Sequence, residues 1–190
     1  MNIQIRLARL NDAPEIGAIH ETGINMIPAV TLQTAPFAEY ETFVSSHGGD
    51  YPLYVAEVDG EIAAWACISP FSSMAGFRQT GEASWYVHPA FAGKGIGKKL
   101  AKHLIREAER AGILTNVVAR IAASNEPSLR LARSLGFTDN PFGGTIKRAG
   151  LRFGEWVDVV FLNRPLGQEA KPEAESVTPT AERPSQLWSA

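Results

Sequence analysis

One short stretch of the sequence, residues 82–100, brings together residue types that could do chemistry. It reads EASWYVHPAFAGKGIGKKL and begins with its single carboxylate, Glu82. A carboxylate can accept a proton from a reacting group. Gly93, Gly95 and Gly97 follow a strand-like segment, and alternating glycines let several backbone amides point inward where a helix starts. Such amides bind anions together with the helix dipole, so the stretch predicts an anion site close to a carboxylate.

Three kinds of phosphate-binding loop are candidates for this glycine pattern. A Walker loop needs a glycine at position 92 and Ser or Thr at position 99, but the chain has Ala92 and Lys99. A dinucleotide-binding loop needs two residues between its second and third glycines, whereas only Ile96 separates Gly95 from Gly97. The third kind ends in Gly-x-Gly at a helix start just after a core strand, and GKGIG fits it.

The elements that position this stretch follow from hydrophobic periodicity and turn signals. The segment EASWYV is expected to be a strand. Apolar residues then recur every four positions from Ile96 until Gly112 ends a helix. Asn125 is expected to start a shorter helix, with Pro127 in its first turn and Gly136 at its end.

Further signals lie on both sides of this region. MNIQIRLARL alternates like a first strand, and a capping box of Asp12 and Glu15 predicts a helix after it. The dipeptide Asp59-Gly60 predicts a hairpin, while NVVARIAA and EWVDVVFL predict later strands. This order of elements predicts a mixed α and β fold, with helices packed against one sheet.

Composition limits the number of domains and the class of partner. With 190 residues, 45% of them hydrophobic, the chain can bury one sizeable core. Residues 1–166 are therefore expected to form one domain, and residues 167–190, rich in Pro, Glu and Ser, a flexible tail. A net charge of −2 at pH 7 argues against nucleic acid or membrane partners. Neither a signal peptide nor a bilayer span is expected, which predicts a soluble protein.

Cysteine and histidine usage predicts neither a disulfide nor a metal site. Cys67 is the only cysteine, and it lies in the apolar run IAAWACIS, which predicts a buried thiol in a reduced cytosol. The four histidines show no metal-ligand spacing with one another or with a carboxylate pair. No metal is expected.

Three motifs taken together resemble the GNAT family of N-acetyltransferases. The stretch GFRQTGEASWYVHPAFAGKGIG is similar to the phosphinothricin-type branch, with Phe77, Arg78, Glu82 and Tyr86 in register. NEPSLRLARSLGF resembles the family's Asn-x-x-Ser helix, and GLRFGEWVDVVFL resembles its Gly-x-Lys-x-Gly-x-Trp-x-Asp-Val ending. The resemblance covers roughly residues 2–164.

This resemblance implies a fold, a co-substrate and a set of site residues. The fold is a mostly antiparallel mixed sheet of about seven strands, with a splay between two central parallel strands and about four helices around it. Acetyl-CoA is the implied co-substrate, with its pantetheine arm in the splay and its pyrophosphate on the glycine loop. Glu82 is implied as a general base that acts through a water on the amine of a small amino-acid-like acceptor.

The implied binding residues and assembly follow from the same resemblance. The implied acetyl-CoA contacts are Trp85, Tyr86, Val87, Gly93, Lys94, Gly95, Ile96, Gly97, Lys98, Asn125 and Ser128. The implied acceptor contacts are Phe77, Arg78 and Trp156. The resemblance also implies a homodimer, and the cysteine usage predicts a cytoplasmic location.

Three departures from the family pattern bear on different steps. Ala92 stands where the family often has Gln or a basic residue, so one phosphate contact is expected to be missing. Ala132 stands where many relatives have Tyr or His as the acid for the leaving thiolate. Ser72 and Met74 replace two arginines of the family's substrate cluster, which leaves Arg78 to pair with an acceptor carboxylate.

These departures leave two alternatives to a small-molecule N-acetyltransferase. One is an acyl-CoA-binding protein that catalyses weakly, because Ala132 and the reduced arginine cluster remove catalytic and binding groups. The other is an acetyltransferase for a peptide N-terminus or a polyamine. A polyamine would call for an acidic pocket, and residues 71–81 hold no carboxylate. The sequence does not identify the acceptor amine.

Overall fold

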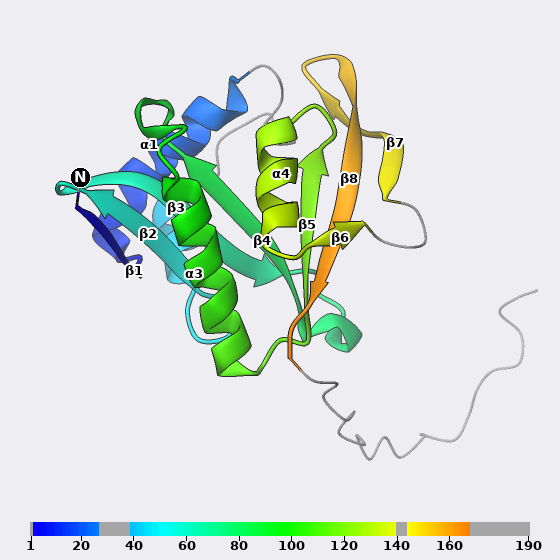
Figure 1. The fold of residues 1–190 in the computed structure, drawn as a ribbon, viewed down its shortest axis with the longest axis horizontal. Coiled ribbons are helices and arrows are strands. Elements are labelled where there is room, and N and C mark those ends of the chain that lie inside the picture. Colours follow the sequence, from blue (N-terminus) through cyan, green and yellow to red (C-terminus); the bar gives the residue numbers. More distant parts are fainter. Residues whose placement is uncertain (1, 27–38, 140–143, 168–190) are drawn as a thin grey trace, which may run out of the picture.

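The computed structural model describes residues 2–26, 39–139 and 144–167. Eight strands form one sheet in the order β1-β2-β3-β4-β5-β8-β6, and β7 pairs with β8 (Figure 1). The strands are β1 (Ile3–Leu7), β2 (Leu53–Val58), β3 (Glu61–Pro70), β4 (Thr80–Val87), β5 (Asn116–Ala122), β6 (Thr138–Asp139), β7 (Thr145–Arg152) and β8 (Glu155–Pro165). The α-helices are α1 (Ala13–Ile24), α2 (Tyr40–Ser45), α3 (Ile96–Ala111) and α4 (Glu126–Ser134). The tail expected over residues 167–190 lies outside the described residues from 168 onward, so that domain boundary stays a prediction.

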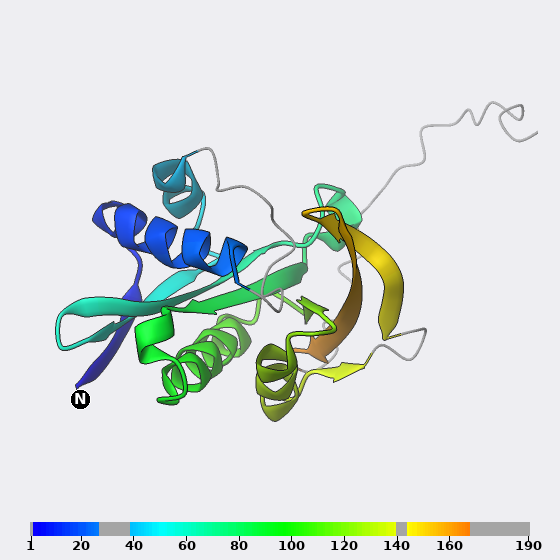
Figure 2. The same ribbon diagram turned by 90° about the horizontal axis from the view of Figure 1, so that it is seen from above.

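The arrangement of strands and helices confirms the predicted fold class. Every strand pair is antiparallel except β4 and β5, which run parallel at the centre of the sheet. Helices α1 and α2 cover one face of the sheet, and α3 and α4 cover the other (Figure 2). The sheet has eight strands rather than about seven, and β6 is only two residues long.

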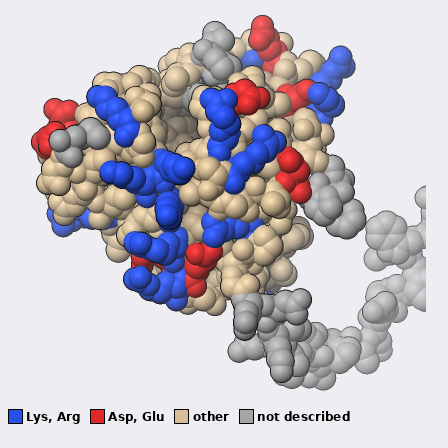
Figure 3. Space-filling view, viewed as in Figure 1, with Lys and Arg blue, Asp and Glu red and all other residues tan. Residues whose placement is uncertain are grey.

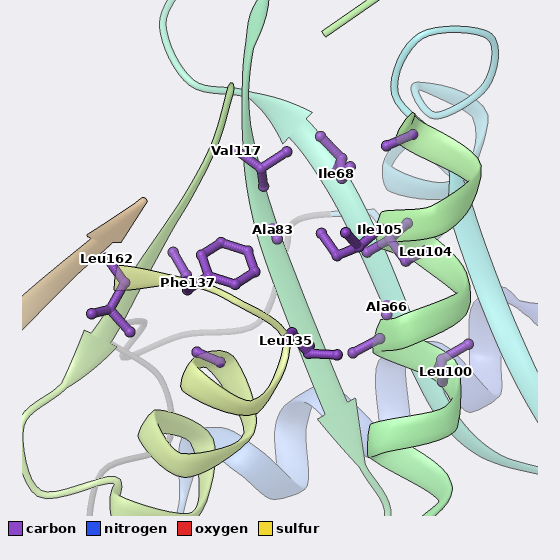
Figure 4. Packing of buried hydrophobic residues seen from close by; sticks show 14 of the residues in the cluster. Ala66, Ile68, Ala83, Leu100, Leu104, Ile105, Val117, Leu135, Phe137 and Leu162 are labelled. Atoms are coloured by element: carbon purple, nitrogen blue, oxygen red, sulfur yellow. The ribbon is translucent and has the colours of Figure 1, made fainter. Parts of the chain in front are cut away.

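Two hydrophobic clusters hold the helices to the two faces of the sheet. On one face, the apolar stripe of α3, which includes Leu100, Leu104 and Ile105, packs on β3 and β4 (Figure 4). On the other face, Ile16 of α1 packs with Trp65 of β3. Residues 63–68 of β3 are therefore buried on both sides, which explains the continuous apolar run in the sequence.

Local sequence signals correctly predicted several element boundaries. Asp59 and Gly60 have φ of 51° and 94°, and positive φ at both central residues is what a two-residue hairpin turn requires. Gly112 ends α3 with φ of 66°. Asn125 caps α4 through its side chain, which accepts from the Ser128 amide at 3.3 Å.

Three elements were not predicted from the sequence: α2, β6 and β7. The helix α2 has only six residues, and β6 has two. Most of β7 is exposed, so it lacks the alternating buried residues that reveal a strand in sequence. A positive φ of 51° at Arg148 also interrupts its register with β8. Pairing with β8, rather than a local preference, stabilises this strand.

The helix α1 begins where expected, but the prediction that the Asp12 side chain caps it was wrong. The Asp12 carboxylate makes no side-chain hydrogen bond to α1. It accepts two hydrogen bonds from Arg6 at 2.7 and 2.9 Å and one from the Arg9 amide at 2.6 Å. Arg6 and the Arg9 amide hold the pKa of Asp12 below its ordinary value. Arg6 of β1 thus binds the Asp12 carboxylate that would otherwise accept hydrogen bonds from the first turn of α1.

The buried thiol of Cys67 is expected to resist alkylation in the folded protein. Burial raises its pKa to about 12, and its side chain is 1% exposed. Because the thiolate is the reactive form, thiol titration with a chromogenic disulfide at pH 8 should detect almost no reaction. The same titration in denaturant should detect one thiol per chain. Rapid reaction without denaturant would contradict the buried position.

Candidate active site

The centre of the site is the point where β4 and β5 separate. The two strands pair in register only from Thr80 with Asn116 to Glu82 with Val118. Beyond Glu82, β4 continues its ladder with β3 and β5 continues its ladder with β8. The edge of β4 from residue 83 to 87 therefore has no ladder partner on the β5 side within the described chain. This is the splay that the sequence motifs implied.

A cleft of about 650 Å³ opens at this splay. Its lining from β4, the glycine loop and α4 comprises Trp85, Tyr86, Val87, Gly93, Gly95, Ile96, Gly97, Lys98, Asn125, Pro127, Ser128, Arg130, Leu131 and Ser134. The surface is visibly hollowed between the start of α3 and α4 (Figure 3). Every residue expected to bind the cofactor lines this cleft except Lys94.

The same cleft passes from one face of the sheet to the other. Ile19, Thr22 and Gly23 of α1 line it, and so do residues of α4, which lies on the opposite face (Figure 2). Beyond Glu82, β4 has no ladder partner on the β5 side within the described chain, so one cavity can extend between the two faces there. The splay therefore connects the α3 and α4 side, where the glycine loop lies, with the α1 and α2 side.

The glycine loop has the geometry of an anion cradle. Gly93 and Gly95 have φ of 74° and 77°, which is the left-handed region that glycine adopts without strain. A Cβ at either position would meet no atom within 4 Å, so the space next to the loop backbone is open. At Gly97 a Cβ would lie 2.9 Å from the Val87 side chain. Gly97 thus lets the start of α3 approach β4 closely.

The two lysines of the loop point to different places. Lys98 lines the cleft. The Nζ of Lys94 instead donates to the carbonyl of Ala90 at 2.9 Å and lies 5.2 Å from the centre of the Phe91 ring. In this conformation Lys94 binds the short turn before the loop.

A hydrogen-bond network ties α4 to β4 at the edge of the cleft. Trp85 Nε1 donates to the Ser128 hydroxyl at 2.9 Å, and Asn125 accepts from the Ser128 amide. The Trp85 ring also packs edge-on against Phe137. These contacts explain why Asn125 and Ser128 lie beside β4 although they are about forty residues away in sequence.

Glu82 lies on the α1 and α2 side of the sheet and is paired with an arginine. It is opposite Ser69 of β3, and alternation along β4 places it on the same face as Tyr86, which packs on the α1 cluster. Its two carboxylate oxygens accept from Nε and Nη2 of Arg120, both at 2.6 Å. The side chains of Glu82 and Arg120 are 17% and 46% exposed.

A second polar group lies next to this ion pair. The hydroxyl of Ser69 lies 3.0 Å from His47 Nε2, and His47 Nδ1 lies 2.7 Å from the carbonyl of Phe43. Nδ1 must donate to that carbonyl, so Nε2 accepts from Ser69. Burial lowers the pKa of His47, which favours this neutral form. Cys67 is opposite Ser84 and Ser69 is opposite Glu82, so the thiol and the carboxylate are diagonal neighbours on this face of the sheet.

The residues expected to bind the acceptor are not brought together. Phe77 packs on Phe71, and Arg78 is exposed in the turn before β4, where its carbonyl accepts from the Tyr51 hydroxyl. Trp156 is 60% exposed at the start of β8. The segment before β4 and the turn between β7 and β8 lie at opposite ends of the molecule (Figure 1).

Sequence reasoning missed three contributions to the site. The end of α1 lines the cleft, although nothing local distinguishes its residues. Pro127, Arg130, Leu131 and Ser134 share one face of α4 at helical spacing, and that signal could have been read from the sequence. Arg120 is the one charged residue in the strand NVVARIA, which was a second usable signal.

The described residues form neither a metal-binding cluster nor a membrane-spanning helix. Within residues 2–26, 39–139 and 144–167, no group of three or more His, Cys, Asp or Glu side chains could hold a metal ion. None of the helices in these ranges has the length and apolar character needed to cross a bilayer.

Comparison with known proteins gives consistent matches. A family profile described as the acetyltransferase (GNAT) family matches residues 23–137. An L-methionine sulfoximine/L-methionine sulfone acetyltransferase of Salmonella typhimurium is 42% identical over 124 residues, which are 65% of this chain and 70% of that protein. An L-amino acid N-acyltransferase of Escherichia coli is 33% identical over 174 residues, which are 90% of this chain and 99% of that protein.

A solved structure matches the fold over nearly the whole chain. It is a GNAT superfamily phosphinothricin acetyltransferase from Sinorhizobium meliloti in complex with acetyl-CoA. The two chains are 31% identical with a TM-score of 0.80, and the match covers 95% of this chain and 98% of that one. The residues matched by the family profile, 23–137, include β4, the glycine loop and α4, which line the cleft.

Proposed function

Because this chain belongs to the acetyltransferase (GNAT) family, we propose that it moves the acetyl group of acetyl-CoA to the α-amine of a small amino-acid-like acceptor. The chain is an acetyl-CoA-dependent N-acetyltransferase; the proposal concerns its acceptor and its catalytic residues. One observation carries it: the cleft crosses the sheet at the splay, and Glu82 lies where the splay begins, on the side opposite the glycine loop. Cofactor and acceptor can therefore enter from different faces.

The residues of the cleft fit acetyl-CoA. The open loop of Gly93 and Gly95 offers backbone amides and the start of α3 to a pyrophosphate. The unpaired edge of β4 offers amide and carbonyl groups to the pantetheine arm. Lys98 and Arg130 add positive charge to the lining. When bound, acetyl-CoA supplies the thioester carbon that the amine attacks.

Glu82 is our candidate for the base that prepares the amine. A protonated amine has no lone pair, so it must lose a proton before its nitrogen can attack the thioester carbon. The new C–N bond then forms as the C–S bond breaks, and CoA leaves as its thiolate. The nitrogen's second proton passes to solvent water, and the thiolate takes up a proton from solvent. An ionised carboxylate has about four acceptor positions. Arg120 occupies two of them, which leaves room for a water that carries the proton.

The leaving thiolate has no acid at position 132. Ala132 is fully buried against the sheet, with 0% exposure, and its methyl group carries no proton to donate. A thiol with pKa of about 8.5 leaves tolerably as the thiolate, so direct transfer can proceed without an acid. This argues against the view that Ala132 turns the chain into a weakly catalytic acyl-CoA-binding protein.

The acceptor proposal rests on relatives whose names specify amino acids or their analogues. The direct test is thiol release from acetyl-CoA with a panel of L-amino acids, L-methionine sulfone, polyamines and short peptides. Turnover with the amino acids or the sulfone, and not with polyamines or peptides, is the expected result. Faster turnover with peptides or polyamines would contradict the proposed amino-acid acceptor. If no compound in the panel releases thiol, the alternative of a weakly catalytic acyl-CoA-binding protein would be favoured.

Arg78 remains a predicted contact of the acceptor's carboxylate. If it has that role, Arg78→Ala should raise the acceptor's KM by about 10- to 100-fold, because a hydrogen bond to a charged group contributes about 1.5–3 kcal/mol. The KM for acetyl-CoA should stay the same. Arg106→Ala is a suitable control, since Arg106 is also exposed and pairs with Glu107 on the same helix. Equal damage to both KM values would indicate a folding role for Arg78.

A cytoplasmic homodimer is part of the same proposal. The β7–β8 hairpin exposes Leu151, Phe153 and Trp156 at 55%, 61% and 60%. Large apolar side chains gathered at one exposed edge favour burial against another chain. The single cysteine, which is unpaired and buried, is compatible with a reducing compartment.

A further inference from the structure

The ion pair between Arg120 and Glu82 lies where β4 and β5 separate. Arg120 stands in a strand whose neighbours Ala119 and Ile121 are buried on the α3 and α4 side. Alternation along β5 therefore places the Arg120 side chain on the α1 and α2 side, together with Glu82. A charged side chain in the middle of an apolar strand requires a reason beyond packing.

Arg120 has unused hydrogen-bonding capacity. A guanidinium carries five N–H donors in a rigid plane. Glu82 uses one from Nε and one from Nη2. In the described part of the chain, no hydrogen bond involves Nη1, so the Nη1–Nη2 edge can still bind a second carboxylate through two parallel hydrogen bonds.

Arg120 also borders the splay. It lines a small cavity of about 40 Å³ with Ser84, Trp85, Tyr86, Asn125 and Ser128 among others. Trp85, Tyr86, Asn125 and Ser128 line the large cleft as well, so the two cavities share a wall. The Arg120 side chain is 46% exposed, which leaves it accessible to a ligand.

We propose that Arg120 binds the α-carboxylate of the acceptor while Glu82 receives the acceptor's α-ammonium group. An α-amino acid carries these two opposite charges on one carbon, and Glu82 and Arg120 present the complementary charges side by side. The zwitterion can lie antiparallel to the ion pair, so that each charge meets its opposite. This inference rests on the proposed function, because it assumes an amino-acid acceptor.

This placement also accounts for the reduced arginine cluster before β4. Ser72 and Met74 stand at positions where the resembled family has arginines. A cation supplied by β5 can bind the acceptor's carboxylate in place of Arg78, and Arg78→Ala should then leave the acceptor's KM unchanged. Arg120 would then select acceptors that carry a carboxylate next to the amine, and it would hold the amine against Glu82.

The test compares two acceptors and four variants. The acceptors are L-methionine sulfone and the matching amino alcohol, in which a CH₂OH group replaces the carboxylate. The variants are Arg120→Gln, Arg120→Lys, Arg78→Ala and, as control, Arg133→Gln. Arg133 is 50% exposed, close to the 46% of Arg120, and it also pairs with a carboxylate, at 3.4 Å, but it does not line the cleft.

Arg120→Gln should lower kcat/KM for L-methionine sulfone by about 10- to 100-fold and for the amino alcohol by less than about 3-fold. The kcat/KM of Arg120→Lys for L-methionine sulfone should lie between those of wild type and Arg120→Gln. Lysine keeps the positive charge but lacks the paired N–H donors of the guanidinium. Arg133→Gln should match wild type. Stabilisation by acetyl-CoA, measured by thermal shift, shows that each variant is folded.

Two outcomes would overturn the inference. Equal losses for both acceptors in Arg120→Gln would mean that Arg120 only orients Glu82. If Arg78→Ala no longer prefers L-methionine sulfone to the amino alcohol, while Arg120→Gln keeps the wild-type preference, the acceptor's carboxylate would be assigned to Arg78. Failure of the proposed function is distinguishable, because wild type would then release no thiol with either acceptor.

Discussion

Glu82→Gln is expected to lower kcat at pH 7 by about 10²–10⁴, the usual contribution of general acid–base catalysis. Glutamine keeps nearly the same shape and can still accept a hydrogen bond from Arg120, but it cannot take up a proton from the amine. Glu82 does not line the large cleft, so the affinity for acetyl-CoA should be unchanged. Steady-state kinetics with L-methionine sulfone, together with an acetyl-CoA thermal shift, measures both quantities.

The pH dependence of this loss separates a base from a residue that only positions the acceptor. An α-amino group has a pKa of about 8, so above that pH most of the acceptor arrives without its extra proton. The deficit of Glu82→Gln should therefore shrink between about pH 7 and pH 9.5. A positioning residue would give a similar deficit at every pH.

Glu109→Gln is the matched control for this experiment. Glu109 also pairs with an arginine, Arg164, but it lies on α3 and does not line the cleft. Its variant should keep wild-type kcat across the pH range. Full activity of Glu82→Gln at pH 7 would show that the proton leaves by another route, and β4 would then retain only a role in cofactor binding.

Gly95→Glu is expected to abolish the stabilisation of the protein by acetyl-CoA. A ligand present at 100 times its Kd stabilises the folded state by about 2.7 kcal/mol, which for a chain of this size raises Tm by roughly 5–10 °C. The variant places a carboxylate in the open space above the glycine loop, where it would repel a pyrophosphate. Differential scanning fluorimetry with and without acetyl-CoA measures the effect.

Gly112→Glu controls for the backbone strain of that substitution. Gly112 has φ of 66°, close to the 77° of Gly95, and an added Cβ also meets no atom within 4 Å. It lies at the far end of α3, outside the cleft. Both variants should lose similar intrinsic stability, since both put a side chain in the left-handed region, but only Gly95→Glu should lose the ligand shift. If acetyl-CoA raises the Tm of Gly95→Glu as much as that of wild type, the glycine loop does not bind the pyrophosphate.

The sequence was sufficient for features that depend on residues close together in the chain. The hairpin at Asp59-Gly60, the helix from Ile96 to Gly112 and the cap at Asn125 each follow from backbone preferences or a repeat of three to four residues. Most of the cofactor cleft belongs to this group as well, because β4, the glycine loop and the start of α3 are continuous in sequence.

Features that depend on contacts between distant residues required the folded chain. Arg6 of β1 removed Asp12 from its expected cap, and β7 exists through its pairing with β8. Glu82 and Arg120 are 38 residues apart, and only the parallel register of β4 with β5 brings them together. Backbone preferences and hydrophobic periodicity act over a few neighbouring residues, so they predict helices, strands and turns. The tertiary structure alone sets which strands are neighbours, and that choice placed an arginine beside the candidate base.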